Sequence, residues 1–263
     1  MRRVNPSKAL HGVRFAFGTL TVFPARITRW DRPAARAGMT LAPLAGLAVG
    51  LCAAAAGAGF WAAGAGSLLV AVVSVAVPAL LTRGLHLDGL ADVADGLGSA
   101  KPAEEALRIM KRSDIGPFGV VALLFLLLAQ IAALSRLYED GWARGAAATV
   151  VSAVAARAAL TLASRRGVPA ARPDGLGAVV AGTVPGRRAA VVAALVTAAS
   201  AAAGLLFGPW SSLHFALAVP AGLAVAQVLL RRCVGRFGGV TGDVFGAVAE
   251  TSATVTLVAL TLG

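Results

Sequence analysis

Three aspartates lie close together in the first half of the chain, within the stretch LTRGLHLDGLADVADGLGSA. On an α-helix, Asp88, Asp92 and Asp95 stand at positions i, i+4 and i+7, so their carboxylates project from one face. Like charges at this spacing repel each other. A divalent cation removes the conflict, because Mg²⁺ takes oxygen ligands from carboxylates and from substrate phosphates. The pattern predicts a magnesium site formed by Asp88, Asp92 and Asp95.

The three aspartates also have an alternative interpretation. A solvated polar loop would use the same acids only to neutralise nearby Lys and Arg, which leaves their placement on one face unexplained.

His86 stands two residues before Asp88 and is a candidate acid or base, or a donor to a phosphate. A merely supporting role for His86 fits the sequence equally well.

A second group of charges precedes the third apolar block, in RIMKRSDIGPFG. Lys111 could hold a phosphate, or it could only anchor the helix end at the lipid headgroups, as could Arg112. Asp114 stands where a helix begins. It is either a simple N-terminal cap or a further member of a metal and phosphate site.

The acidic, glycine-rich element RFGGVTGDVFGAVAE lies near the C-terminus. If a helix starts near Thr241, Asp243 and Glu250 fall on one face, with Glu250 about two turns into the membrane. Ionisable groups at that depth are candidates for function. The alternative is that Asp243 caps the helix and Glu250 pairs with an Arg. Arg157, in the middle of an apolar block, is expected to pair with an acid or with a substrate phosphate.

Transmembrane helices are the elements that must position these residues. The chain has 263 residues, 58% of them hydrophobic and 14% charged, whereas a soluble domain has about 25% charged residues. A spanning helix needs about 20 mostly apolar residues. Seven blocks approach this length, over roughly 41–62, 66–82, 118–137, 145–164, 189–207, 213–230 and 244–262. The predicted fold is all-α: a polytopic membrane bundle of about seven helices, with residues 1–263 forming a single integral membrane domain.

The basic residues predict how these helices are oriented. Cytoplasmic loops collect Lys and Arg, and 21 of the 24 basic residues lie in segments that share one side if the N-terminus is cytoplasmic: 1–40, 83–117, 165–188 and 231–243. We therefore expect an interfacial N-terminal segment, a cytoplasmic catalytic loop over 83–117 and a second cytoplasmic site element over 238–250. No basic surface interleaved with aromatic residues is visible, so the net charge of +12 indicates a lipid bilayer and not a nucleic acid.

The motifs HLDGLADVADG, SDIGPFG and GGVTGD, in this order, resemble those of the cobalamin synthase family, the adenosylcobinamide-GDP ribazoletransferases of vitamin B12 assembly. The resemblance extends from FGTLTVFP near the N-terminus through the ARPDGLG loop, and so covers most of the chain. It implies a Mg²⁺-dependent enzyme of a bacterial cytoplasmic membrane. This enzyme joins adenosylcobinamide-GDP to α-ribazole, or to α-ribazole 5′-phosphate, and releases GMP.

The resemblance also implies roles for individual residues. Asp88, Asp92 and Asp95 would bind the metal and the pyrophosphate, supported by His86, Asp114 and Asp243. Asp95, if it is not fully committed to the metal, is the candidate base for the ribazole hydroxyl. Arg112 is a departure from the family pattern, because an acidic residue is expected before the serine of SDIG.

Two other functions fit part of the pattern. A CDP-alcohol phosphotransferase also has spaced aspartates, but its Ala-Arg pair after the first Asp-Gly is missing here. A secondary transporter would place its acids near the middle of the membrane, in broken helices of paired repeats, whereas these acids cluster towards one face. A homo-oligomeric assembly is compatible with the sequence.

Overall fold

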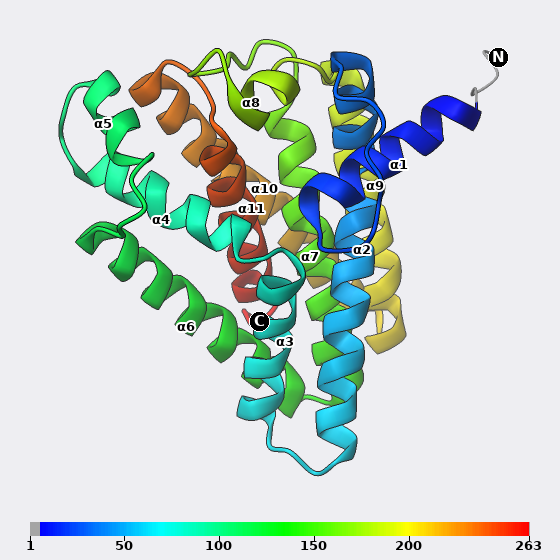
Figure 1. The fold of residues 1–263 in the computed structure, drawn as a ribbon. Helices are drawn as coiled ribbons and strands as arrows, with labels where there is room; N and C mark the ends of the chain where they lie inside the picture. The colour runs from blue at the N-terminus through cyan, green and yellow to red at the C-terminus, as the bar shows by residue number, and fades with distance from the viewer. Residues whose placement is uncertain (1–5, 263) are drawn as a thin grey trace.

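The computed structural model describes residues 6–262, which form helices and loops without a named β-strand. Helices α1 to α11 and one short 3₁₀ helix, η1, follow one another along the chain (Figure 1). Their bounds are α1 Pro6–Leu20, α2 Arg32–Ala62, α3 Ser67–Leu81, α4 Leu85–Gly98, α5 Ala103–Ile109, α6 Pro117–Glu139, α7 Trp142–Ala163, α8 Gly175–Val180, α9 Gly186–Gly204, η1 Leu205–Phe207, α10 Pro209–Phe237 and α11 Gly242–Ala259. The predicted all-α membrane bundle is confirmed.

All seven predicted blocks are helical, but fewer of them qualify as membrane spans. Among the described residues, five helical segments are long and apolar enough to cross a bilayer: α2, α6, α7, α9 with η1, and α10. A sixth crossing results if α3 and α4 count together. The C-terminal block, α11, contains Asp243 and Glu250, and most of its residues are buried inside the bundle. Seven spans were therefore too many by length and composition, because α11 is too polar and α3 too short.

The chain turns sharply between α3 and α4. Helix α3 has only 15 residues, and the axis of α4 lies at 89° to it. Arg83 and Gly84 both have left-handed backbone conformations, with φ of 55° and 69°. This conformation is costly for Arg and easy for Gly, and it cannot continue a right-handed helix. Helix α4 consequently runs across the end of α3 (Figure 1) and is not itself a spanning segment.

The loops predicted to share one side of the membrane meet at one end of the bundle. Backbone hydrogen bonds join Ala171 N–H to the Val240 carbonyl (3.0 Å) and Val240 N–H to the Pro169 carbonyl (2.9 Å). The Arg236 guanidinium donates to the Lys101 carbonyl. Segments 83–117, 165–188 and 231–243 are therefore held together, as the distribution of basic residues predicts.

Two predicted segment boundaries differ from the structure. Helix α2 begins at Arg32, inside the region 1–40 that was expected to be a cytoplasmic or interfacial segment, and Asp31 caps it by accepting from Ala34 N–H (2.9 Å). The region 83–117 is largely helical, since it contains α4 and α5. The helical spacing of its aspartates agrees with α4, and burial of Leu90 and Val93 against the bundle stabilises this helix.

Candidate active site

Two glycines allow α4 to cross α11 at very short range. A Cβ atom on Gly89 would lie 2.7 Å from the backbone oxygen of Asp243 and 2.8 Å from its Cα. One turn further along the crossing, a Cβ on Gly246 would lie 2.9 Å from the carbonyl oxygen of His86. Only glycine fits such a backbone approach. The crossing therefore brings the carboxylates of α4 beside the first turn of α11.

Asp92 lies at the centre of the resulting acidic group. Burial is the largest cause that raises the pKa of Asp92, to about 7. The carboxylates of Asp243 and Asp88 raise it further, and that of Asp95 does so to a smaller extent. We call Asp88, Asp92 and Asp243 the acid cluster. Asp88 is exposed, whereas Asp92 and Asp243 are half-buried.

Arg172 is the cation that faces this cluster. Its charge lowers the pKa of Asp92 and so opposes the effects of burial and of the neighbouring acids. The guanidinium also donates to the carbonyl of Leu107 in α5. Gly177 holds the same loop against the start of α11, because a Cβ there would lie 2.9 Å from the Cα of Thr241. Arg172 is not among the site residues predicted from the sequence, although the ARPDGLG motif contains it.

Asp95 is engaged in a contact that the sequence analysis did not predict. Its two carboxylate oxygens accept hydrogen bonds from the backbone N–H groups of Gly116 (2.8 Å) and Gly119 (2.9 Å), and its residue surface is 7% exposed. These groups belong to the first turn of α6, whose N-terminal N–H groups have no partner within the helix. Asp95 therefore caps α6 from another helix, and its roles as a metal ligand and base stay predictions. Of the two alternatives for Asp114, capping of α6 is not what the structure shows, because α6 has Gly116 at its N-cap and no cap from a nearby side chain.

Replacing Asp95 with Ala is expected to lower the free energy of unfolding by about 2 kcal/mol, because the first turn of α6 loses a charged cap. Thermal unfolding of the purified protein in detergent measures this loss. Asp114→Ala is the matched control, since Asp114 is exposed and makes no side-chain hydrogen bond among the described residues. Equal melting temperatures for the two variants would contradict the capping role.

His86, Arg157 and Glu250 lie inside the bundle. The His86 side chain is 3% exposed, and its Nδ1 is 4.0 Å from Glu250 Oε1. Glu250 also accepts a hydrogen bond from Gln130 Nε2 (3.0 Å). Arg157 and Glu250 both line an interior cavity of about 40 Å³, which has room for roughly two or three water molecules.

This interior position bears on three predicted roles. The cavity is smaller than a phosphate-bearing substrate, and substrate binding by Arg157 and Glu250 stays a prediction. Residue Arg157 is 3% exposed, and its Nε and Nη2 atoms have no hydrogen-bond partner among residues 6–262. The imidazole of His86 is buried beside Glu250, which fits the supporting role that the sequence left open for His86. Its action as an acid or base stays a prediction. Spacing alone could not reveal the buried position of His86, because it does not show which helix face is buried.

The basic and acidic residues after α5 remain at the surface. Lys111 Nζ lies 3.8 Å from a carboxylate oxygen of Asp174, and both side chains are mostly exposed. Asp114 is exposed as well. Neither residue belongs to the acid cluster, although Lys111 is tied loosely to the loop that carries Arg172. Phosphate binding by Lys111 and Asp114 stays a prediction.

The acid cluster fits a divalent cation by its donor chemistry. It offers hard carboxylate oxygens from two helices, and their mutual repulsion raises the pKa of Asp92. In the part of the chain that the structure describes, no three His, Cys, Asp or Glu side chains converge closely enough to form a ready metal centre. A cation held by Asp88, Asp92 and Asp243 would therefore also need outside oxygens, such as water or substrate phosphates. This arrangement is common for Mg²⁺.

Nearly the whole chain matches one known protein family. A family model described as "Cobalamin-5-phosphate synthase" matches residues 12–261, which is nearly the whole chain. The chain belongs to the cobalamin-5-phosphate synthase family. All the elements of the site in this family member, α4, the loop around Arg172 and the start of α11, lie inside the matched range.

Relatives of this cobalamin-5-phosphate synthase family member cover similar lengths. A protein of Frankia casuarinae is 46% identical over 265 residues, covering 95% of this chain and 94% of the relative. A protein of Nocardioides sp. is 41% identical over 247 residues, covering 94% of this chain and 96% of the relative. An Escherichia coli K12 protein is 39% identical over 195 residues, covering 74% and 76%. All three are named adenosylcobinamide-GDP ribazoletransferase. No solved structure matches the chain.

Membership of the cobalamin-5-phosphate synthase family separates the chain from the two alternative functions. It identifies an enzyme of late cobalamin assembly, and neither a CDP-alcohol phosphotransferase nor a transporter. The acid cluster, with carboxylates from two helices beside one arginine, is the candidate place for the chemistry of this family member.

Proposed function

We propose that the protein is a Mg²⁺-dependent transferase that joins adenosylcobinamide-GDP to α-ribazole, or to α-ribazole 5′-phosphate, with release of GMP. In this reaction a ribazole hydroxyl oxygen forms a bond to the phosphorus on the cobinamide side of the diphosphate. The bond between that phosphorus and the oxygen of GMP breaks, and the hydroxyl loses its proton. The observation that carries the proposal is the acid cluster beside Arg172, in a chain of this family.

Each residue of the cluster has a role in this proposal. Asp88, Asp92 and Asp243 would hold the cation by their carboxylate oxygens. A bound Mg²⁺ neutralises charge on the diphosphate and aligns its oxygens, which is the main protein-assisted contribution to phosphoryl transfer. Arg172 would bind a phosphate oxygen of the diphosphate.

We further propose that the acid cluster faces the cytoplasm of a bacterial cell. The end of the bundle that carries it also carries most of the Lys and Arg residues, and basic loops stay on the cytoplasmic side. Labelling of single cysteines in intact cells by a membrane-impermeant reagent tests this orientation. A cysteine in place of exposed Glu104 should be protected, and one in place of exposed Glu139 should react.

Incubation of the purified protein with adenosylcobinamide-GDP and α-ribazole, with and without Mg²⁺, tests the reaction directly. Release of GMP together with formation of adenosylcobalamin is expected only in the presence of the cation. A parallel reaction with α-ribazole 5′-phosphate identifies the preferred acceptor. Product formation at the full rate after removal of all divalent cations would exclude the proposed role of the acid cluster.

The raised pKa of Asp92 predicts a competition between protons and Mg²⁺. The Asp92 carboxyl must lose its proton to bind a cation, so at low Mg²⁺ the rate should rise as pH increases through about 7. A tenfold higher Mg²⁺ concentration should move this midpoint to lower pH by up to about one unit. Rates measured between pH 5.5 and 8.5 at several Mg²⁺ concentrations check the expectation. A midpoint that is independent of Mg²⁺ would contradict it.

A further inference from the structure

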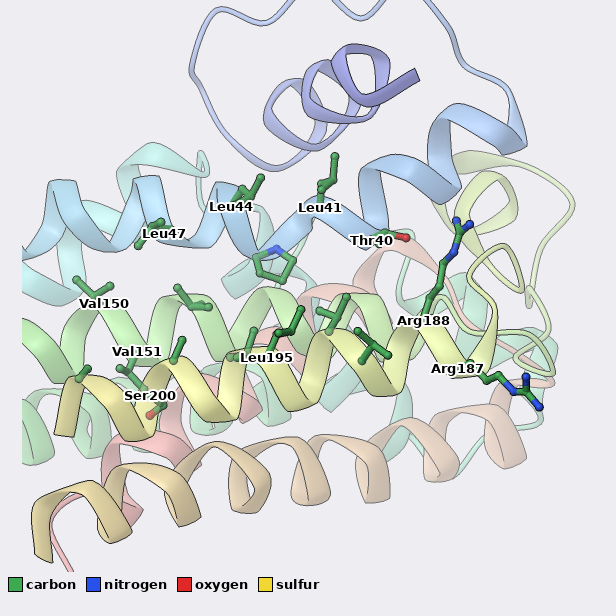
Figure 2. A pocket seen from close by; sticks show the side chains of 17 residues that line it. Thr40, Leu41, Leu44, Leu47, Val150, Val151, Arg187, Arg188, Leu195 and Ser200 are labelled. Carbon is green, nitrogen blue, oxygen red and sulfur yellow. The ribbon is translucent and has the colours of Figure 1, made fainter. Parts of the chain in front are cut away.

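A groove of about 720 Å³ opens between α2 and α9 on the outside of the bundle, with α7 as its floor (Figure 2). Its lining is almost entirely apolar, and Leu44, Leu47, Val191 and Leu195 are between 40% and 64% exposed. The groove exists because α2 packs closely on α7: a Cβ on Gly50 would lie 2.9 Å from the Cα of Val150. Helix α9 packs mainly on α10 and α7 and touches α2 only slightly.

Two arginines at one end are the charged residues of this groove. Arg187 and Arg188 belong to the first turn of α9, both are exposed, and neither makes an ion pair or side-chain hydrogen bond within residues 6–262. Figure 2 shows both guanidinium groups at the end of the groove near α8, with Arg188 extending towards α2. The positive end of the α9 dipole lies at the same place. This is also the end of the bundle that carries the acid cluster.

The remaining polar atoms of the lining are already bonded inside the protein. The Thr40 hydroxyl donates to the Arg36 carbonyl (2.7 Å), and the Ser200 hydroxyl donates to the Phe215 carbonyl (2.7 Å). Pockets for polar small molecules carry a few well-placed polar groups that orient the ligand, and this groove offers them at its arginine end. A fitting occupant is therefore apolar along its length and anionic at one end.

The length of the groove agrees with a lipid chain. Its lining on α9 runs from Arg187 to Ala203, a distance of about 24 Å at 1.5 Å per residue. The hydrocarbon core of a bilayer is about 30 Å thick. Each leaflet supplies about half of this thickness, so an acyl chain that starts at the arginines can lie along the part of the groove nearest to them, and the rest of the groove extends into the other leaflet.

We propose that this groove is a binding site for an anionic phospholipid, whose phosphate contacts Arg187 and Arg188 and whose acyl chain lies against α7. Basic pockets between transmembrane helices are suited to anionic headgroups. A second copy of this chain would cover the apolar walls but would leave the two arginines unexplained. The inference goes beyond the proposed transferase reaction and does not depend on it, since it concerns a different face of the molecule.

Native mass spectrometry of the full chain in detergent, titrated with phosphatidylglycerol or phosphatidylcholine, tests the proposal. Phosphatidylglycerol should bind at least about tenfold more tightly. The double variant Arg187→Gln/Arg188→Gln should reduce phosphatidylglycerol binding to the level of phosphatidylcholine. Ala199→Trp should weaken the binding of both lipids, because Ala199 is exposed and lines the groove.

Matched controls separate this site from general lipid contact. Arg231→Gln/Arg232→Gln changes another exposed arginine pair at the same end of the bundle, and Ala198→Trp changes an exposed alanine outside the groove. Both should bind lipid as the unchanged protein does. Equal affinity of the unchanged protein for the two lipids, or the same loss in a control, would overturn the proposal. Displacement of phosphatidylglycerol by adenosylcobinamide-GDP would also overturn the proposal, because the groove would then bind the substrate. A lipid-free dimer that Ala199→Trp dissociates would do the same, because a second copy of the chain would then cover the groove.

Discussion

Replacing Asp92 with Asn is expected to lower product formation by at least about 100-fold without lowering the melting temperature of the protein. The magnitude follows from the loss of one charged group that stabilises the transition state. Asn has nearly the same shape as Asp, so the packing of α4 is preserved. It also removes a charge that burial and the carboxylates of Asp243 and Asp88 disfavour. Substrate turnover and thermal unfolding in detergent, measured on the same preparation, check both halves of this result.

A suitable control for Asp92→Asn is Glu104→Gln, which neutralises a fully exposed acid in α5 at the same end of the bundle. That variant should retain its activity. Asp88→Asn should resemble Asp92→Asn, because both residues belong to the acid cluster. If Asp92→Asn kept full activity, the cluster could not be the place where the diphosphate is bound. An inactive protein with a much lower melting temperature would instead show that Asp92 is needed for folding.

The second large effect is expected for Gly89→Ala. The new methyl group would lie 2.7 Å from the Asp243 oxygen and 2.8 Å from its Cα, and backbone atoms cannot give way as a side chain does. Helix α4 must therefore move away from α11, which separates Asp88 and Asp92 from Asp243. A displacement of about 1 Å can cost about 100-fold in rate. Overpacking of this kind should also lower the free energy of unfolding by about 1–3 kcal/mol.

Gly235→Ala is the matched control for Gly89→Ala. Gly235 is also helical, in α10, and a Cβ there would meet no atom within 4 Å. Since Ala favours a helix by up to about 1 kcal/mol over Gly, the control should be as stable as the unchanged protein or more so. Gly89→Ala should therefore lose both activity and stability. Gly235→Ala should keep its activity and should be as stable as the unchanged protein or more so. Normal activity in Gly89→Ala would show that close contact between α4 and α11 is not required.

Much of the fold could be predicted from the sequence, because apolar blocks and basic loops are local signals. All seven apolar blocks are helical, and the segments rich in Lys and Arg lie at one end. The number of spans could not be predicted as well. The bend at Arg83 and Gly84 depends on two consecutive left-handed residues, and the interior position of α11 depends on the helices around it.

The candidate site was predicted in part. Spacing correctly placed Asp88 and Asp92 on α4 and Asp243 at the start of α11, on segments that the structure brings together. Spacing could not show that Asp95 turns to the N–H groups of Gly116 and Gly119, which lie more than twenty positions away. The role of Arg172 was hidden for a similar reason, since it depends on a hydrogen-bonded contact between two loops.

The shortness of α3 has a consequence for the surrounding bilayer. Fifteen residues rise only about 22 Å, which is less than the hydrocarbon thickness of about 30 Å. On this side the protein matches only part of the membrane, so the lipids next to α3 must thin or water must enter beside it. The beginning of α4, with Asp88, would then lie below the level of distant headgroups. The thickness of the surrounding membrane would then determine how far below the headgroups a polar substrate must reach to approach Asp88.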